Sequence, residues 1–156
     1  MTYNRDAAIT YARKWAFGRN PQYGDFQSLG GDCTNFVSQC LYSGCGIMNY
    51  TRDTGWYYRS LNDRAAGWCG VEYLFRFLTG NLSAGPYATE IPLNGARPGD
   101  IIQLCFDGVQ YGHSLFIVGM DPELLVATHS DDALDRPLRS YRYQAARLLR
   151  IQGVRG

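Results

Sequence analysis

Apolar residues recur every three or four positions in three stretches of the first half of the chain, which is the spacing of an amphipathic helix. The first stretch predicts a helix from about Arg5 to Ala16, with Asn4 or Thr2 as its N-cap. The same spacing predicts helices over Cys33–Ser43 and Cys69–Leu78. The buried stripe of the first helix consists of Ala8, Ile9, Ala12, Trp15 and Ala16.

The second half carries short apolar and β-branched runs that are typical of strands. A turn through Asp121 and Pro122 separates two of these runs, which we expect to pair as an antiparallel hairpin. Gly80–Gly99, rich in glycine and proline, is predicted to be a connection. Helices followed by an antiparallel sheet predict a segregated α+β fold. The predicted strands are Asp100–Phe106, His113–Met120, Leu124–Ser130 and Ala146–Gln152.

Composition indicates one globular domain over residues 1–156, because 46% of the residues are hydrophobic and 14% are aromatic. The net charge is only +1, so we expect neither nucleic acid nor an anionic membrane as a partner, and we expect a monomer. No apolar run reaches transmembrane length. The first residues, MTYNRDAAITYARKW, are too polar for a signal peptide.

The segment Gly30–Cys40, GGDCTNFVSQC, predicts a loop that places a cysteine at the start of a helix. Two glycines allow a tight turn, and Asp32 suits a helix N-terminus. A thiol in the first turn lies near free N–H groups and the positive end of the helix dipole, both of which favour the nucleophilic thiolate. Cys33 is therefore a candidate nucleophile, although a plain buried cysteine is the alternative.

The five cysteines give no regular pattern. An odd number without even spacing does not define a disulfide framework, and the pairing of Cys40, Cys45, Cys69 and Cys105 stays open. A zinc site would normally show CxxC or HExxH spacing, which this chain lacks, so we expect no metal.

The chain has only two histidines, and both fall at strand ends. His113 begins one predicted strand of the hairpin and His129 ends the next. If the two strands pair in antiparallel fashion, the two imidazoles come close together although they are sixteen positions apart. A cysteine, a histidine and a polar orienting residue are the constellation of a thiol hydrolase.

The chain resembles the "putative amidase domain" family from Tyr3 to about Ile151. The segments that carry the resemblance are YNRDAAITYARKWAF, NPQYGDF, GGDCTNFVSQCLYSGC, GWYY, RPGDIIQL, GHSLFIVG and VATHSDD. This family is similar to the papain-like cell-wall peptidases of the NlpC and CHAP type. The resemblance implies a papain-like fold and an extracellular or cell-wall location.

The resemblance also assigns roles to site residues. It makes Cys33 the nucleophile, His113 the general base and His129 the third polar residue. Because the third position varies among such enzymes, Asp131 or Asp132 is the alternative orienting residue for His113.

Four further residues are candidates for substrate binding. Gln27 lies six residues before Cys33, where papain-like peptidases place an oxyanion-hole glutamine, although the Cys33 N–H is the stronger donor candidate. Trp56, Tyr57 and Trp68 fall in predicted loops, where they either line a substrate groove or pack in the core.

These features together predict a cysteine amidase or peptidase that forms a thioester and requires no cofactor. The expected substrate is an amide bond of peptidoglycan or another peptide, either between stem-peptide residues or between sugar and peptide. An acyltransferase of transglutaminase type, using the same Cys33 and His113, is one alternative. A non-catalytic cell-wall-binding module is the other.

Overall fold

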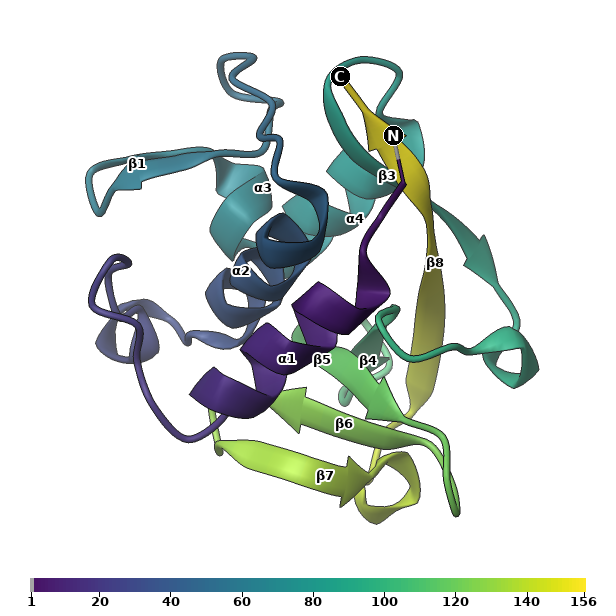
Figure 1. The fold of residues 1–156 in the computed structure, drawn as a ribbon. Coiled ribbons are helices and arrows are strands. Elements are labelled where there is room, and N and C mark those ends of the chain that lie inside the picture. Colours follow the sequence, from purple (N-terminus) through teal and green to yellow (C-terminus); the bar gives the residue numbers. More distant parts are fainter. Residues whose placement is uncertain (1) are drawn as a thin grey trace.

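The computed structural model describes residues 2–156, and Figure 1 shows their arrangement. The helices are α1 (Arg5–Trp15), α2 (Cys33–Cys45), α3 (Ala66–Cys69) and α4 (Val71–Gly80). Single 3-10 turns cover Gln27–Leu29, Leu93–Gly95 and Leu138–Ser140. The strands are β1 (Tyr58–Ser60), β2 (Asp63–Arg64), β3 (Gly85–Ile91), β4 (Ile101–Cys105), β5 (Tyr111–Gly119), β6 (Leu125–Thr128), β7 (Ala133–Pro137) and β8 (Ala145–Arg155).

Six of the strands form one antiparallel sheet in the order β3-β8-β4-β5-β6-β7, and β1 pairs with β2 in a separate hairpin. In Figure 1, α1 and α2 lie against one another in front of the central strands. The expectation of helices followed by an antiparallel sheet, in a mixed α+β fold, is confirmed.

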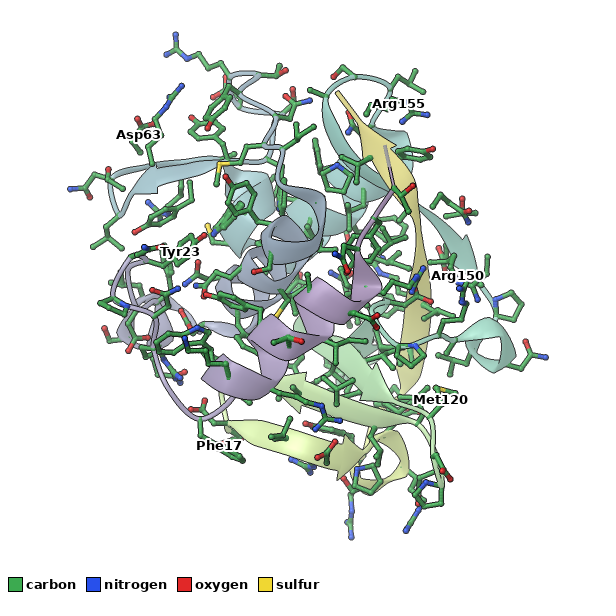
Figure 2. The ribbon with its side chains drawn as sticks, viewed as in Figure 1. Phe17, Tyr23, Asp63, Met120, Arg150 and Arg155 are labelled. Atoms are coloured by element: carbon green, nitrogen blue, oxygen red, sulfur yellow. The ribbon has the colours of Figure 1, made fainter. Side chains whose placement is uncertain are left out.

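Both faces of the sheet are buried, and β5 shows how its residues divide between them. Phe116 and Val118 pack with α1, α2 and α4 in the larger core. Leu115 and Ile117 point the other way, into a smaller core beneath the loops after β3 and β7. This alternation follows from the two-residue period of a strand. Side chains fill both layers in Figure 2, where Phe17 projects outward beyond the end of α1.

Hydrogen bonds and close packing hold α1 in place. Asn4 caps the helix as expected, because its side-chain oxygen accepts the Ala7 N–H at 3.0 Å. Arg5, in the first turn, donates to the buried Asp100 at the start of β4 at 2.9 Å. A shift of α1 along the sheet would therefore remove one of the two arginine partners of a buried carboxylate.

Several elements differ from the sequence prediction. The helix expected over Cys69–Leu78 is confirmed as α4, but it begins two residues later, because Gly70 takes an extended conformation (φ −111°, ψ 133°) that separates it from the short, unpredicted helix α3. The expected connection Gly80–Gly99 contains edge strand β3, whose glycine and proline obscure the strand pattern. β7 and the β1–β2 hairpin were also not predicted, since they are short and half exposed. Every helix within residues 2–156 is too short or too polar to span a membrane.

The chain segment before α1 approaches α2 so closely at Gly44 that a larger residue there should destabilise the fold. A Cβ at Gly44 would lie 2.6 Å from the Asn4 carbonyl oxygen and 2.6 Å from Tyr3 Cε1. Gly44→Ala is expected to lower the free energy of unfolding by about 1–3 kcal/mol, the usual cost of overpacking. Gly80→Ala is the control, because a Cβ there meets nothing within 4 Å. Urea denaturation measures both, and equal stability of the two variants would contradict the close approach.

Candidate active site

The loop before α2 sets the position of Cys33, which is the first residue of the helix. Gly30 (φ 107°) and Gly31 (φ 112°) both take left-handed backbone conformations that other residues rarely adopt. The chain thus turns sharply into the helix, and the Cys33 side chain ends almost buried, with the residue 7% exposed.

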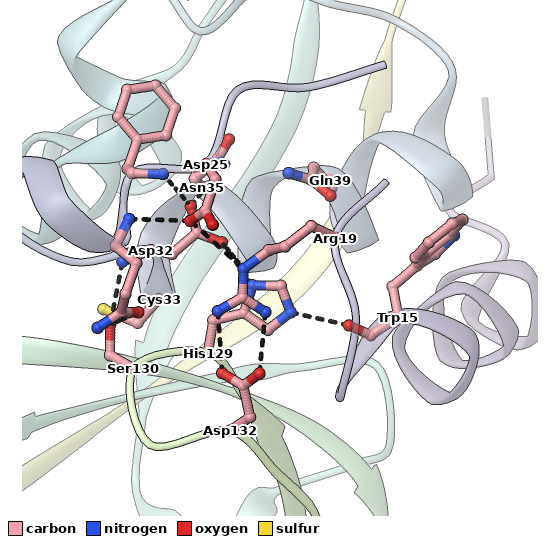
Figure 3. A network of polar contacts seen from close by, with 12 residues as sticks. Trp15, Arg19, Asp25, Asp32, Cys33, Asn35, Gln39, His129, Ser130 and Asp132 are labelled. Atoms are coloured by element: carbon pink, nitrogen blue, oxygen red, sulfur yellow. Dashed lines mark hydrogen bonds and ion pairs between the residues drawn. The ribbon is translucent and has the colours of Figure 1, made fainter. Parts of the chain in front are cut away.

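The carboxylate of Asp32 is a fully buried hub beside the cysteine, and Figure 3 shows its contacts. It accepts hydrogen bonds from the Phe26 N–H at 2.8 Å, the Asn35 amide at 2.9 Å and His129 Nδ1 at 2.5 Å. The Arg19 guanidinium lies 3.6 Å away. Burial acts to raise the pKa of Asp32, but these hydrogen bonds outweigh it and hold the pKa below its ordinary value.

His129 joins three elements at this hub. Its Nδ1 faces Asp32, its Nε2 faces the Trp15 carbonyl oxygen at 2.8 Å, and its ring stacks on Phe36 with centroids 4.1 Å apart. Both nitrogens face oxygen acceptors, so both hydrogen bonds form only when the ring carries two protons. Through Asp32 and the Trp15 carbonyl, His129 ties the end of β6 to α2 and to the end of α1.

The turn between β6 and β7 contacts the loop before α2. Ser130 (φ 63°) and Asp131 (φ 65°) are consecutive left-handed residues without glycine, a costly backbone arrangement that needs support from its surroundings. Ser130 Oγ supplies that support, since it accepts the Asp32 N–H at 3.0 Å and donates to Gln27 Oε1 at 3.3 Å. Gln27 is otherwise exposed, in the loop before α2.

The Cys33 sulfur lies at the edge of β5 that pairs with β6, just beyond the last residue of β6. The Ser114 N–H donates to Cys33 Sγ at 3.5 Å, and the Ser114 carbonyl accepts from Thr128 Oγ1 at 3.1 Å. The N–H and C=O of one strand residue point to the same side, here toward β6. Because β6 ends at Thr128, the thiol takes the next position along that edge.

His113 and His129 lie on opposite faces of the sheet. The hairpin itself is confirmed, with Phe116 opposite Ala127, and extending this register places His129 opposite Ser114. His129 thus faces α2, whereas His113 faces the smaller core, with Nε2 3.4 Å from Thr128 Oγ1. The expectation that the two imidazoles come close together is wrong. His129 lies opposite Ser114 rather than His113, and neighbouring residues of a strand point to opposite faces of the sheet.

His113 is 9% exposed at the edge of a cavity of about 500 Å³. Cys33 itself is not part of the lining. No hydrogen bond joins His113 to Cys33 or to His129 within residues 2–156. The cavity is lined by Phe106, Gly112, His113, Ser130, Asp131, Arg136, Ser140, Tyr141 and Arg142.

Burial sets the protonation of the two candidate reacting groups. It raises the pKa of the Cys33 thiol, and the hydrogen bonds from Ser114 and Thr34 offset only part of that rise. Burial likewise lowers the pKa of His113 to about 4, with nearby Asp131 raising it and Arg136 lowering it. At neutral pH the site therefore holds a thiol and a neutral imidazole, not the thiolate that the helix terminus favours.

The three candidates for the orienting residue have different surroundings. Asp131 shares the cavity with His113. Asp132 pairs with Arg19 at 2.9 Å, and His129 pairs with Asp32. Of the three candidates, Asp131 is thus the one near the His113 ring. Thr128 contacts the ring directly and was not predicted as a site residue.

The aromatic candidates divide between core and surface. Trp56 and Trp68 are fully buried and donate their indole N–H groups to Ser38 Oγ at 3.0 Å and Asn35 Oδ1 at 2.9 Å. Neither indole is accessible to a substrate in this structure, so core packing explains both. Tyr57 is half-buried at the surface, near the Arg59 guanidinium.

All five cysteines are free thiols in the structure, which settles the open pairing in favour of no disulfide. Across residues 2–156, no group of three or more histidine, cysteine, aspartate or glutamate side chains is arranged to hold a metal ion.

Comparison with known proteins identifies the family. The model described as "Putative amidase domain" matches residues 2–151, and the chain belongs to this family. The chain is also similar to the uncharacterized protein YhbB of Bacillus subtilis, with 32% identity over 123 residues. That match covers 76% of this chain but 38% of YhbB, so the chain spans less than half the length of this relative. No solved structure matches the chain.

The sequence prediction missed the Asp32 hub and the Ser130 contact. A hint was present, since Asp32 directly precedes the cysteine and Ser130 directly follows His129. The role of Asp32 was obscured because an aspartate before a helix resembles an ordinary N-cap. In the structure its carboxylate makes no capping hydrogen bond.

The lowered pKa of His113 predicts how stability depends on pH. The unfolded chain takes up a proton near pH 6.5 but the folded chain only near pH 4, so stability is lost as pH falls between these values. At about 1.4 kcal/mol per unit, the loss is roughly 3 kcal/mol over the whole window. His113→Gln should remove this component, as measured by urea denaturation at successive pH values. An unchanged slope in His113→Gln would show that another group is responsible.

Proposed function

We propose that this protein is a cysteine-dependent amide hydrolase of papain-like fold, with Cys33 as nucleophile and His113 as general base. The observation that carries the proposal is the placement of the Cys33 sulfur at the start of α2 against the Ser114 N–H, one residue from His113. Membership of the amidase family supports hydrolysis of an amide bond. The papain-like assignment is supported by a cysteine-bearing helix packed on an antiparallel sheet with a histidine near the start of a strand.

The reaction begins with both groups neutral. His113 takes the proton from the Cys33 thiol as the sulfur attacks the amide carbonyl carbon. The resulting oxyanion receives hydrogen bonds from the Cys33 backbone N–H and, from the other side, the exposed Gln27 amide. The C–N bond then breaks, and His113 returns its proton to the leaving amine, which leaves a thioester on Cys33.

Water completes the cycle. It adds to the thioester carbonyl while His113 accepts one of its protons, and the C–S bond breaks to release a carboxylic acid. The proton held by His113 then restores the Cys33 thiol. Asp131, in the same cavity, favours the protonated imidazole that exists between these steps.

The substrate we propose is a peptide amide of peptidoglycan. The support is the resemblance of the Cys33 and His113 segments to cell-wall peptidases, together with the charges of the cavity. Asp131 and Arg136 lie in one cavity of about 500 Å³ and could pair with the amino and carboxyl groups that stem peptides carry.

Digestion of purified peptidoglycan tests the proposal. The wild-type protein should release fragments with new amino and carboxyl termini, detected by mass spectrometry, and Cys33→Ala should fall to background. His113→Ala should lose about 10²–10⁴-fold in rate, the usual contribution of a general base. Cys69→Ala is the matched control, because that thiol is on α3 and donates to the Ala65 carbonyl rather than to a residue of the site.

Two results would overturn the proposal. One is wild-type hydrolysis by a folded Cys33→Ala protein, which would exclude the nucleophile. The other is the absence of any new amide cleavage by the wild-type protein on both peptidoglycan and its soluble stem peptides.

A further inference from the structure

A row of buried polar residues crosses the face of the sheet that packs on the helices. In the strand register, Gln103 on β4 lies opposite both Ser114 on β5 and Arg147 on β8. Gln103 and Ser114 are fully buried, and Arg147 is 8% exposed. Such residues cost stability unless each is hydrogen-bonded, so the row requires a complete set of partners.

Arg147 anchors one end of the row. Its guanidinium donates to Gln103 Oε1 from two nitrogens, at 2.9 and 2.7 Å, and to Glu72 at 3.0 Å. The rings of Phe75 and Tyr111 lie 3.6 and 4.0 Å from its central carbon. The guanidinium has donors only, so it fixes which end of the Gln103 amide is the oxygen.

The direction of each remaining hydrogen bond then follows. The Gln103 amide nitrogen donates to the Val71 carbonyl at 2.9 Å and to Ser114 Oγ at 3.3 Å. Either hydroxyl can be the donor in the contact between Ser114 Oγ and Thr34 Oγ1, which lie 3.0 Å apart. Because Gln103 already donates to Ser114 Oγ, the Ser114 proton is satisfied when it is donated to Thr34. In that arrangement the Thr34 proton is free to be donated to Cys33 Sγ at 3.8 Å, the other hydrogen-bond partner of this hydroxyl among residues 2–156.

We propose that Arg147, Gln103 and Ser114 form a directional hydrogen-bond relay that aims the Thr34 hydroxyl at the Cys33 sulfur as a donor. The sulfur then receives the Thr34 O–H in addition to the Ser114 N–H. Both stabilise negative charge on sulfur, which develops when the thiol loses its proton. Thr34 contacts the reacting atom, and the other three side chains act as positioning residues. The use of this relay in catalysis rests on the proposed function.

The relay offsets the cost of burial at Cys33. A buried thiolate is unfavourable, and the Thr34 and Ser114 hydrogen bonds both act to lower the pKa of Cys33 against the desolvation that raises it. A fixed donor is effective here because it needs no reorganisation when the charge forms. This gives the buried Arg147 on β8 a role beyond packing.

The pH dependence of Cys33 alkylation by iodoacetamide tests the relay without any substrate. Peptide mapping separates Cys33 from the other four cysteines, and the midpoint of the rate against pH reports formation of the thiolate. Thr34→Val keeps the side-chain shape but removes the hydroxyl. It should raise the midpoint by about one pH unit, which slows alkylation about tenfold below the midpoint.

Two further variants make the test specific. Thr34→Ser retains the hydroxyl and should restore the wild-type midpoint. Gln103→Glu replaces the donor by an acceptor, so Ser114 would donate to Glu and Thr34 to Ser114, leaving the sulfur without the Thr34 proton. Gln103→Glu should thus raise the midpoint as much as Thr34→Val, and combining the two should add nothing. Thr10→Val, on the exposed face of α1, is the matched control.

The relay would be overturned by an unchanged midpoint in folded Thr34→Val, or by a shift in Thr34→Ser equal to that in Thr34→Val. Thermal unfolding monitored by circular dichroism establishes that each variant is folded. Because alkylation needs no substrate, a failure of the relay is distinguishable from a failure of amide hydrolysis. If the variants shift the alkylation midpoint as expected but the wild-type protein hydrolyses no amide, the result would count against the proposed function alone.

Discussion

The buried carboxylate of Asp32 is the interaction on which the site depends. It accepts three hydrogen bonds, from the loop before α2, from α2 itself and from His129 at the end of β6. A buried charge that loses a partner costs several kcal/mol, so these segments are held together. The backbone that carries Cys33 is consequently rigid, and the strained turn at Ser130 and Asp131 is held against it.

These contacts place the thiol of the proposed nucleophile in an unusual environment. Cys33 Sγ lies at the edge of β5, where β6 has ended, and it is nearly removed from water. Burial raises its pKa, and burial also keeps His113 neutral. At neutral pH, Cys33 is therefore a thiol rather than a thiolate. In the proposed reaction, charge forms only when a base removes the proton. The Ser114 N–H already faces the sulfur then, and the Thr34 hydroxyl is the second donor we propose.

Much of this arrangement could be predicted from the sequence. Helical spacing after the glycine pair placed Cys33 at a helix start, and strand patterns placed both histidines at the ends of a hairpin. The faces of the histidines could not be predicted, because they depend on a register offset of one residue. The buried relay through Gln103 was also hidden, since it joins the neighbouring strands β4 and β5 to β8 and to α2, which are distant in sequence. Trp56 and Trp68 lie in segments without an apolar period, and only tertiary packing shows that they are buried.

The most direct test is acylation of the protein by p-nitrophenyl acetate, followed by acid quenching and peptide mapping by mass spectrometry. The account predicts that wild-type protein carries the acetyl group on Cys33 as a thioester that hydroxylamine removes. It predicts much slower labelling at Cys33 in Asp32→Asn, which removes the charge that pairs with His129 and so loosens the loop. Acylation mainly at Cys40, Cys45, Cys69 or Cys105, or an equal rate at Cys33 in Asp32→Asn, would contradict it.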